Sequence, residues 1–557
     1  MTATSTRRAA RLALVLAGTL ALGAPALAKD EIVIGITQFP STLHPHINAM
    51  LAKSYIISAA MRPLTTYDQD WKMVCVLCTE LPTIDNGGAV VETLEDGSQG
   101  VAVTYTIQPE ARWGDGVPVT SDDALFTWQV GRDEQSGFAG IEGFRRTLSV
   151  EVVDDKTFTF HVDRLTYQYN DANGFYLLPR HREAEAFADP AQYRFRTRYD
   201  TAPTDPGLYY GPYRVTEVES GSHVVLEPNP TWYGPKPHFK RVVVRVIENT
   251  AALEANLLSG AIDYVAGELG FTVEQALSFE SRNRDRFDVL YKPGLIYEHL
   301  DVNLDNPVLA DRRVRQALLY ALDRDNMTAK LFGGRQPVAD SNVNPLDRVH
   351  AEEVPRYPYD PDRAVALLED AGWTELRDGV RRNEAGERLS FPLMTTAGNK
   401  SRELVQQVLQ SEWRKVGVEA VIRNEPARVF FGETTAKRQN PGLSMYAWLS
   451  APESVPLSTL RSDQIPAEAN GWSGQNYPGY RNERMDALID TIERELDAQA
   501  RLPLWAELQA LYATDLPALP LYFRAEAYAF PKWLEGVRPT GHLVTTTMWI
   551  EEWRARD

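Results

Sequence analysis

The feature that most constrains how this chain can fold is the lack of any linker along its 557 residues. Its 36 glycines and 35 prolines are spread evenly, with no short repeat, charge block or low-complexity tract between them. At about 100–200 residues per domain, a chain of this length is expected to form roughly three folding units. Without linkers, such units are tied by close chain crossings rather than arranged one after another.

Hydrophobic periodicity predicts a mixed α/β protein whose first half is rich in strands. Residues 101–107 are β-branched and aromatic. Segments 150–153 and 157–162 flank an Asp-Asp turn, which is typical of a hairpin. Residues 241–247 are almost all apolar, as expected for a strand covered on both faces.

The second half is rich in predicted helices with clear capping signals. Asp360, followed by proline, suits the N-cap of a helix that ends before Gly372. Asp311 precedes a second apolar stripe, and Ser401 opens a third helix that is closed by Gly417. We interpret the stripes as faces turned to the core.

The N-terminus carries the three parts of a secretory signal. Three arginines precede an apolar run over residues 12–22, and a small-residue cleavage site follows at residues 26–28. We therefore predict a signal peptide over residues 1–28, because the apolar run is too short to span a bilayer. Lys29 follows instead of a cysteine, so we expect no lipid anchor and a soluble exported protein. Removing the signal takes the formal net charge from -18 to -21.

Only two cysteines are present, Cys75 and Cys78. In the cytosol this spacing would suggest redox chemistry or half of a zinc site. In an oxidising compartment a local disulfide is the simpler interpretation, and we expect one here.

The sequence contains no recognisable catalytic motif. It has no phosphate-binding glycine loop, no His-Glu-x-x-His and no Gly-x-Ser-x-Gly. His44 and His46 could share a metal, but no further ligands are apparent, so we expect no metal site. Asp122 and Asp123 could be glycosidase acids, yet they stand where a helix should begin. We expect no catalytic residues, no cofactor and no enzyme activity.

Composition favours a binding protein. The acidic balance argues against nucleic acid or an anionic membrane as the main partner. The 12 Trp, 24 Tyr and 19 Phe could form aromatic walls that bury a ligand at little cost in side-chain entropy.

A series of motifs gives the chain a family resemblance. It resembles the peptide-type extracellular solute-binding proteins of ABC importers, which include dipeptide, oligopeptide and nickel binders. The motifs follow the family's order along the chain, at residues 41–46, 113–123, 211–215, 229–234, 258–263, 303–324 and 359–372. Most of them are turns and helix ends, which specify a fold rather than a ligand.

The resemblance implies an α/β, periplasmic-binding-protein-like fold. Two main lobes would be joined by a hinge of two chain crossings, near residues 291–303 and 520–523, with an additional third lobe and the ligand in the cleft between lobes. The expected segments are the signal peptide 1–28, lobe I at 29–66, 207–291 and 521–557, lobe II at 67–206, and lobe III at 292–520.

The resemblance also implies a function and partners. The protein would be the periplasmic solute-binding component of an ABC transporter. It would capture peptides or a related small solute by hinge closure and deliver them, as a monomer, to permease subunits in the inner membrane.

Carrying the family's ligand contacts onto this chain predicts a set of binding residues. They are Ala49, Met50 and Leu51 for the peptide backbone, Phe138 over the cleft, Tyr446, Trp448 and Leu449 on a strand, Tyr297 and Tyr522 at the crossings, and the segment containing Ala451 and Glu453.

One position departs from the family. Peptide binders usually carry an aspartate three residues after the matching tryptophan, where it pairs with the ligand's α-ammonium, but here that position is Ala451. A buried ammonium without a partner would cost several kcal/mol. Either Glu453 or another acid replaces the aspartate, or the residues align two positions away, or the ligand is a sugar, opine or metal chelate. A secreted hydrolase and a sensor or chaperone are the alternatives from other classes.

Overall fold

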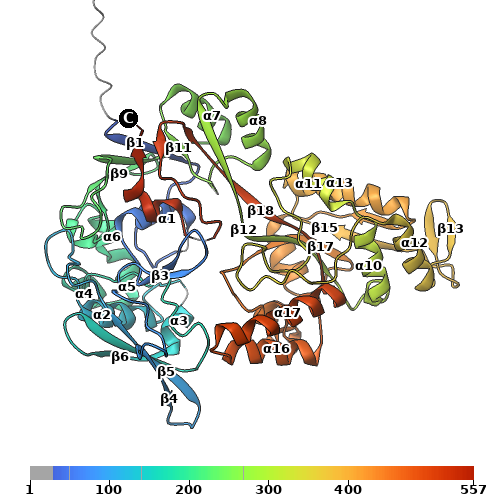
Figure 1. The fold of residues 1–557 in the computed structure, drawn as a ribbon, viewed down its shortest axis with the longest axis horizontal. Helices are drawn as coiled ribbons and strands as arrows, with labels where there is room; N and C mark the ends of the chain where they lie inside the picture. Colours follow the sequence, from blue (N-terminus) through green and yellow to red (C-terminus); the bar gives the residue numbers. More distant parts are fainter. Residues whose placement is uncertain (1–28, 49, 140, 268, 543, 557) are drawn as a thin grey trace, which may run out of the picture.

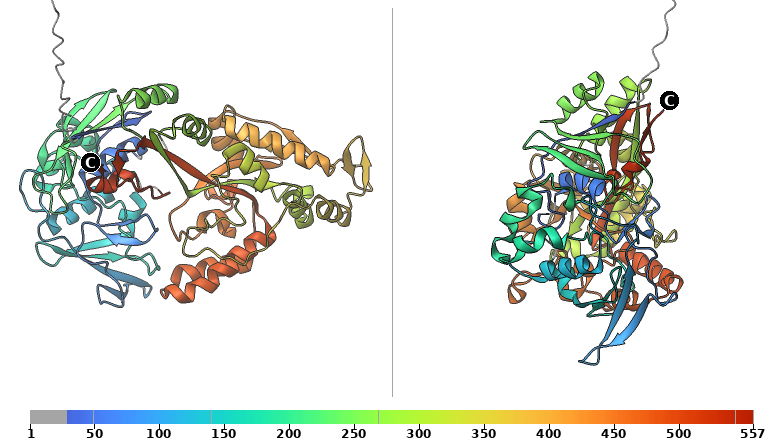
Figure 2. Two further views of the ribbon diagram at one scale, coloured as in Figure 1. Left: turned by 45° about the horizontal axis from the view of Figure 1, so that its top comes forward. Right: turned by 90° about the vertical axis from the view of Figure 1, so that its left-hand side faces the viewer.

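The computed structural model describes residues 29–556 except 49, 140, 268 and 543. The predicted signal peptide, residues 1–28, lies outside the described residues. Two bodies lie side by side and are joined by two long strands, β12 (Phe287–Val302) and β18 (Ala518–Pro531), as Figures 1 and 2 show. No helix in the described residues combines the length and apolar character that a bilayer crossing would need.

A ten-stranded sheet runs through both bodies in the order β16-β15-β17-β12-β18-β11-β1-β10-β9-β8. The first body contains β1 (Glu31–Ile36), β8 (Tyr213–Glu219), β9 (His223–Pro228), β10 (Arg241–Val246) and β11 (Tyr264–Val265). The second body contains β15 (Ser390–Met394), β16 (Glu419–Ile422) and β17 (Leu443–Leu449). The central strands β12 and β18 are antiparallel to each other, whereas β1 is parallel to both of its neighbours, β10 and β11. The mixed α/β prediction is confirmed.

The pairing of β12 with β18 is interrupted twice near its middle, between Pro293 and Tyr297 and between Glu298 and His299. At the first interruption the backbone of Gly294 passes close to Gly541. A side chain at position 294 would lie about 2.4 Å from the Gly541 carbonyl oxygen, so only glycine fits there. The predicted crossing at residues 520–523 falls within β18, and the one at residues 291–303 overlaps β12, which ends at Val302. The predicted lobe boundaries stay a prediction.

The first body also contains a four-stranded antiparallel sheet. Its strands are β4 (Ala89–Thr93), β5 (Gln99–Thr106), β7 (Thr157–Val162) and β6 (Thr147–Val152), in that order. The predicted hairpin is confirmed as the β6–β7 pair. The helices of this body are α1 (Leu51–Ala60), α2 (Ser121–Arg132), α3 (Ile141–Arg146), α4 (Arg180–Phe187), α5 (Pro190–Arg196), α6 (Arg198–Thr201), α7 (Thr250–Ser259) and α8 (Val273–Asn283).

Strand β10 shows why its sequence is uniformly apolar. Val242 and Val244 join the core on one face of the sheet, and Val243 joins a separate core on the other face. The prediction of a strand covered on both faces is therefore confirmed.

Helices pack around the strands of the second body. They are α9 (Pro307–Ala310), α10 (Arg312–Tyr320), α11 (Arg324–Phe332), α12 (Pro361–Asp370), α13 (Lys400–Lys415), α14 (Ala427–Val429), α15 (Leu457–Leu460), α16 (Glu483–Arg494) and α17 (Ala498–Asp515). Asp311 and Asp360 cap α10 and α12 as predicted. The start of α13 was predicted wrongly: Asn399 caps it by accepting from the Arg402 N–H, while Ser401 bonds to Glu274.

Short elements complete the chain. The strands are β2 (Thr65–Tyr67), β3 (Met73–Cys75), β13 (Glu375–Arg377), β14 (Val380–Arg382), β19 (Leu534–Glu535) and β20 (Arg554–Ala555). The 3-10 helices are Pro206–Leu208, Ser462–Gln464, Glu468–Asn470 and Thr546–Glu552, and a π-helix covers Phe430–Thr435. Cys75 and Cys78 form a disulfide beside β3.

A buried ion network ties the two crossing strands to α13. Glu298 on β12 is fully buried and pairs with Arg402 of α13 at 3.0 Å and with Arg524 of β18. Although burial alone would raise it, the two guanidinium groups hold the pKa of Glu298 below its usual value. Among the described residues, Glu298 is the only carboxylate that forms an ion pair with either arginine.

We predict that Glu298→Gln lowers the free energy of unfolding by about 3–5 kcal/mol, because it leaves buried guanidinium charge without a counter-ion. The matched control is Glu507→Gln, which breaks the exposed Arg484–Glu507 pair and should cost at most about 1 kcal/mol. Equilibrium denaturation measures both variants. Equal losses in the two would contradict this role for Glu298.

Candidate functional site

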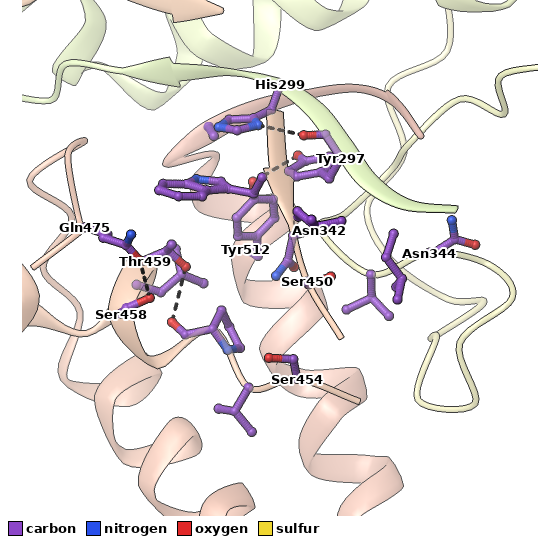
Figure 3. Close-up of a pocket in the computed structure, with 18 of the residues that line it drawn as sticks. Tyr297, His299, Asn342, Asn344, Ser450, Ser454, Ser458, Thr459, Gln475 and Tyr512 are labelled. Carbon is purple, nitrogen blue, oxygen red and sulfur yellow. Dashed lines mark hydrogen bonds between the residues drawn. The ribbon is translucent and has the colours of Figure 1, made fainter. Parts of the chain in front are cut away.

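A cavity of about 260 Å³ lies in the second body, beside β12, the end of β17 and α17. Loop 342–349 and segment 450–460 complete its walls. Figure 3 shows these side chains converging from elements that are far apart in the sequence. We call this cavity the aromatic pocket.

Aromatic rings form much of its surface. Tyr297 and Tyr512 face each other with their hydroxyl groups 3.0 Å apart, and the Tyr297 ring stacks on His299 at a centroid distance of 5.0 Å (Figure 3). Trp448 and Trp505 also line the pocket. Such walls can bury apolar and polar parts of a solute together.

Two carboxylates line the same pocket. Asp301 accepts a hydrogen bond from Tyr446, and Asp347 accepts from the backbone N–H groups of Glu453 at 2.8 Å and Val349 at 3.2 Å. Within the described residues, no lysine or arginine lines the pocket or lies within ion-pair distance of either carboxylate. Burial raises the pKa of Asp347 to about 6. The pocket therefore presents two carboxylates that form no ion pair with an arginine or lysine among the described residues, although the charge of nearby Arg348 also acts on Asp347.

Three buried polar atoms of the pocket have no hydrogen-bond partner among the described residues. They are His299 Nε2, Asn342 Oδ1 and Trp505 Nε1. His299 Nε2 lies 3.2 Å from Asp301, but the orientation does not make a hydrogen bond. Leaving such groups unsatisfied costs about 1–3 kcal/mol each, so a solute that pairs with them would recover that energy.

Four of the predicted binding residues come together in this pocket. Tyr297, Trp448, Leu449 and Ala451 all line it. Tyr446 lies behind Trp448, with the two rings 5.4 Å apart, and reaches the pocket only through its bond to Asp301. Tyr522 is buried in the core of the second body and does not line the pocket.

Glu453 does not present a free carboxylate. Its side chain pairs with Arg348 at 2.7 Å and lies 3.8 Å from Arg501. Its backbone adopts a left-handed conformation with φ of 55°, held by Asp347 at the N–H and by Tyr167 at the carbonyl oxygen. These contacts give Glu453 a structural position next to the pocket.

The remaining predicted residues lie in the first body. Met50 occupies the N-cap position of α1 without a side-chain capping bond, and Leu51 begins the helix, whereas Ala49 lies outside the described residues. Phe138 is buried and stacks on His46 at 4.8 Å. None of the three described residues lines the aromatic pocket, and their contact with a ligand stays a prediction.

The histidines and acids that could have suggested a metal or a catalytic site have structural partners. His44 bonds to the Tyr193 hydroxyl, and His46 bonds to the Tyr176 carbonyl oxygen. In the part of the chain that the structure describes, no three histidine, cysteine or acidic side chains are grouped as a metal site would require. Asp123 forms the capping box of α2, as expected of a helix-start acid.

Sequence reasoning missed His299, Asp301, Asn342, Asp347 and Trp505. A signal existed for the first two, because Tyr297, His299 and Asp301 alternate along β12 and so point to one side. Asp347 stands in a loop, where no periodicity marks its direction.

A lobed α/β fold with a polar and aromatic pocket is typical of one class of proteins, the solute-binding proteins. Residues 87–463 match the model of the bacterial extracellular solute-binding proteins, family 5 Middle, and the chain belongs to this family. The resemblance inferred from the motifs is thereby confirmed.

Known relatives and structures cover most of the chain. The oligopeptide-binding protein AppA of Bacillus subtilis is 25% identical over 466 residues, covering 81% of this chain and 80% of that protein. The oligopeptide-binding protein from Thermus thermophilus, solved with a pentapeptide, is 28% identical, with a TM-score of 0.69 and coverage of 95% and 96%. NikZ of Campylobacter jejuni, solved with Ni(L-His), shares the fold. It has a TM-score of 0.71 at 21% identity, covering 94% of this chain and 99% of that one.

The raised pKa of Asp347 predicts a pH dependence of stability. Because the folded state binds this proton more tightly than the unfolded chain, the group's contribution is complete below about pH 4 and is lost as pH rises through about 6. The wild-type free energy of unfolding, relative to that of Asp347→Asn, should fall by at most about 3 kcal/mol over this range. Equilibrium unfolding at pH 4 and pH 7 tests this, and a difference that does not change with pH would contradict it.

Proposed function

We propose that this protein is the periplasmic solute-binding component of an ABC transporter and that it captures peptides with a free N-terminus. It would close over the ligand about the hinge strands β12 and β18 and deliver it, as an exported soluble monomer, to permease subunits in the inner membrane. The family membership and the oligopeptide-binding relatives support this proposal.

The observation that carries the peptide assignment is the charge of the aromatic pocket. A peptide's N-terminal ammonium would place its positive charge near Asp301 and Asp347, which have no lysine or arginine partner among the described residues. Asn342 Oδ1 offers a further acceptor. These groups would take the role of the aspartate that other peptide binders carry at the position of Ala451. Glu453 would stay paired with Arg348 and close to Arg501.

The same charge disfavours the non-peptide alternatives that carry net negative charge. An anionic metal chelate or a carboxylate-rich opine would meet two acids, and within the described residues it would find no arginine or lysine in the pocket wall. A neutral sugar could donate hydroxyl hydrogen bonds to the carboxylates but would bring no positive charge to balance them. The family consists of solute-binding proteins, which favours binding over hydrolysis.

Binding of matched free and N-acetylated tripeptides tests the proposal. Calorimetry should show at least tenfold weaker binding of the acetylated form, because a hydrogen bond to a charged group contributes about 1.5–3 kcal/mol. Thermal unfolding should shift upward with the free peptide, since the ligand binds only the native state.

Two variants identify the anchor. Asp347→Asn should remove most of the preference for the free amine, whereas Glu453→Gln should keep it. Equal affinity for the free and acetylated peptides would rule out ammonium recognition. If a sugar, an opine or a nickel chelate stabilised the protein and no peptide did, the peptide assignment would be wrong.

A further inference from the structure

The aromatic pocket contains two buried carboxylates, although one ammonium group can neutralise only one of them. Asp301 has 6% of its surface exposed and Asp347 has 7%. Both line the pocket, and neither forms an ion pair with an arginine or lysine among the described residues. Because a buried charge without a counter-ion is costly, a ligand with a single positive charge would leave one of the two acids unbalanced.

The two acids are attached near opposite ends of the pocket wall that β12 forms. Asp347 belongs to a loop held at the start of this wall, where its N–H donates to the Asn344 carbonyl oxygen at 2.9 Å and the Asn344 side chain donates to the Gly294 carbonyl oxygen at 2.6 Å. Asp301 lies seven residues beyond Gly294 on the same strand, roughly 20 Å further at about 3.3 Å per residue. An ammonium nitrogen reaches its acceptors at only about 3 Å, so the two acids would take two cationic groups.

Beside Asp301, His299 adds an unpaired acceptor. Its Nδ1 lies 3.1 Å from the Tyr297 carbonyl oxygen, which can only accept, so Nδ1 carries the proton (Figure 3). In the neutral ring Nε2 is then an acceptor, and it lies 3.2 Å from the Asp301 carboxylate with no hydrogen-bond partner among the described residues. Only 1% of His299 is exposed. A ligand group with several N–H donors would satisfy both acceptors.

The surroundings of Asp301 suit a basic side chain. Tyr446 donates its hydroxyl to this carboxylate, and its ring lies 5.4 Å from the ring of Trp448, which lines the pocket. Aromatic rings pack against the alkyl stem of lysine or arginine, and their faces attract the charged head. Arg438 lines a small neighbouring cavity together with Asp301, but its guanidinium pairs with Asp305 at 2.7 Å. This arginine therefore does not occupy the Asp301 carboxylate.

We propose that the protein prefers peptides whose first residue is lysine or arginine. This inference rests on the proposed peptide function. Asp347 would hold the N-terminal ammonium, while Asp301 and His299 would hold the ammonium or guanidinium of the first side chain. Such a ligand would balance both buried carboxylates at once, whereas a peptide with a neutral first residue would balance only one.

Calorimetry with free-amine tripeptides tests this preference. Three of them begin with lysine, arginine or norleucine and continue with two alanines. The lysine and arginine peptides should bind at least about tenfold more tightly than the norleucine peptide, whose neutral side chain is of similar length, because hydrogen bonds to charged groups are the strong ones. A fourth tripeptide carries lysine between two alanines and has the same net charge as the first. It controls for general attraction to an acidic protein and should lack most of the gain.

Asp301→Asn identifies the residue that holds the side-chain cation. Asparagine keeps an acceptor for the Tyr446 hydroxyl but has no charge, so this variant should bind the lysine and norleucine peptides with nearly equal affinity. The matched control is Glu507→Gln, which removes one negative charge from an exposed ion pair of the same body and should keep the wild-type preference. Thermal unfolding checks that each variant is folded.

Three results would overturn this inference. The first, which needs no variant, is equal affinity of the wild-type protein for the lysine and norleucine peptides. The second is an equal gain from lysine at the second position, and the third is a folded Asp301→Asn variant that keeps the wild-type preference. In each case free-amine peptides still bind and the proposed function stands. If the wild-type protein bound none of the tripeptides, the proposed function would fail, and this inference with it.

Discussion

The rest of the structure depends on the antiparallel pairing of β12 with β18. These strands cross between the bodies and form the middle of the ten-stranded sheet. Side chains alternate along a strand, so β12 serves two purposes at once. Tyr297, His299 and Asp301 face the aromatic pocket, while Glu298 faces the buried arginines that secure the crossing. Movement at the crossing would therefore displace part of the pocket wall.

Electrostatics divides the acids near the pocket into two kinds. Glu453 is engaged by two arginines and by its backbone contacts, which makes it part of the scaffold. Asp347 accepts only backbone hydrogen bonds on its carboxylate, and burial makes its negative charge costly. A cationic solute would lower that cost, so a ligand with a positive charge should stabilise the protein most. The alanine at 451 is compatible with this arrangement, because the acid comes from a different loop.

The sequence predicted the features that depend on local physics. Asp360 and Asp311 cap helices because a carboxylate can accept free N–H groups wherever a helix begins, and the β6–β7 hairpin follows from alternation around a turn. Asn399 and Ser401 were both local candidates for the N-cap of α13. Asn399 caps the helix, because the Ser401 hydroxyl is bonded to Glu274 in a distant part of the chain. Four of the residues that the family resemblance predicted to contact ligand line one pocket, and their contact with ligand stays a prediction. The resemblance could not find Asp347 or the Tyr167–Glu453 bond, because the first is a loop residue and the second joins residues 286 positions apart.

The central claim is that the aromatic pocket holds a positively charged end of the ligand. A crystal structure of the protein with a free-amine tripeptide measures this most directly. The ammonium nitrogen should lie within hydrogen-bond distance of the Asp347 or Asp301 carboxylate. A structure in which the peptide's carboxylate occupies the pocket, or in which the ammonium is held by other residues, would contradict the claim.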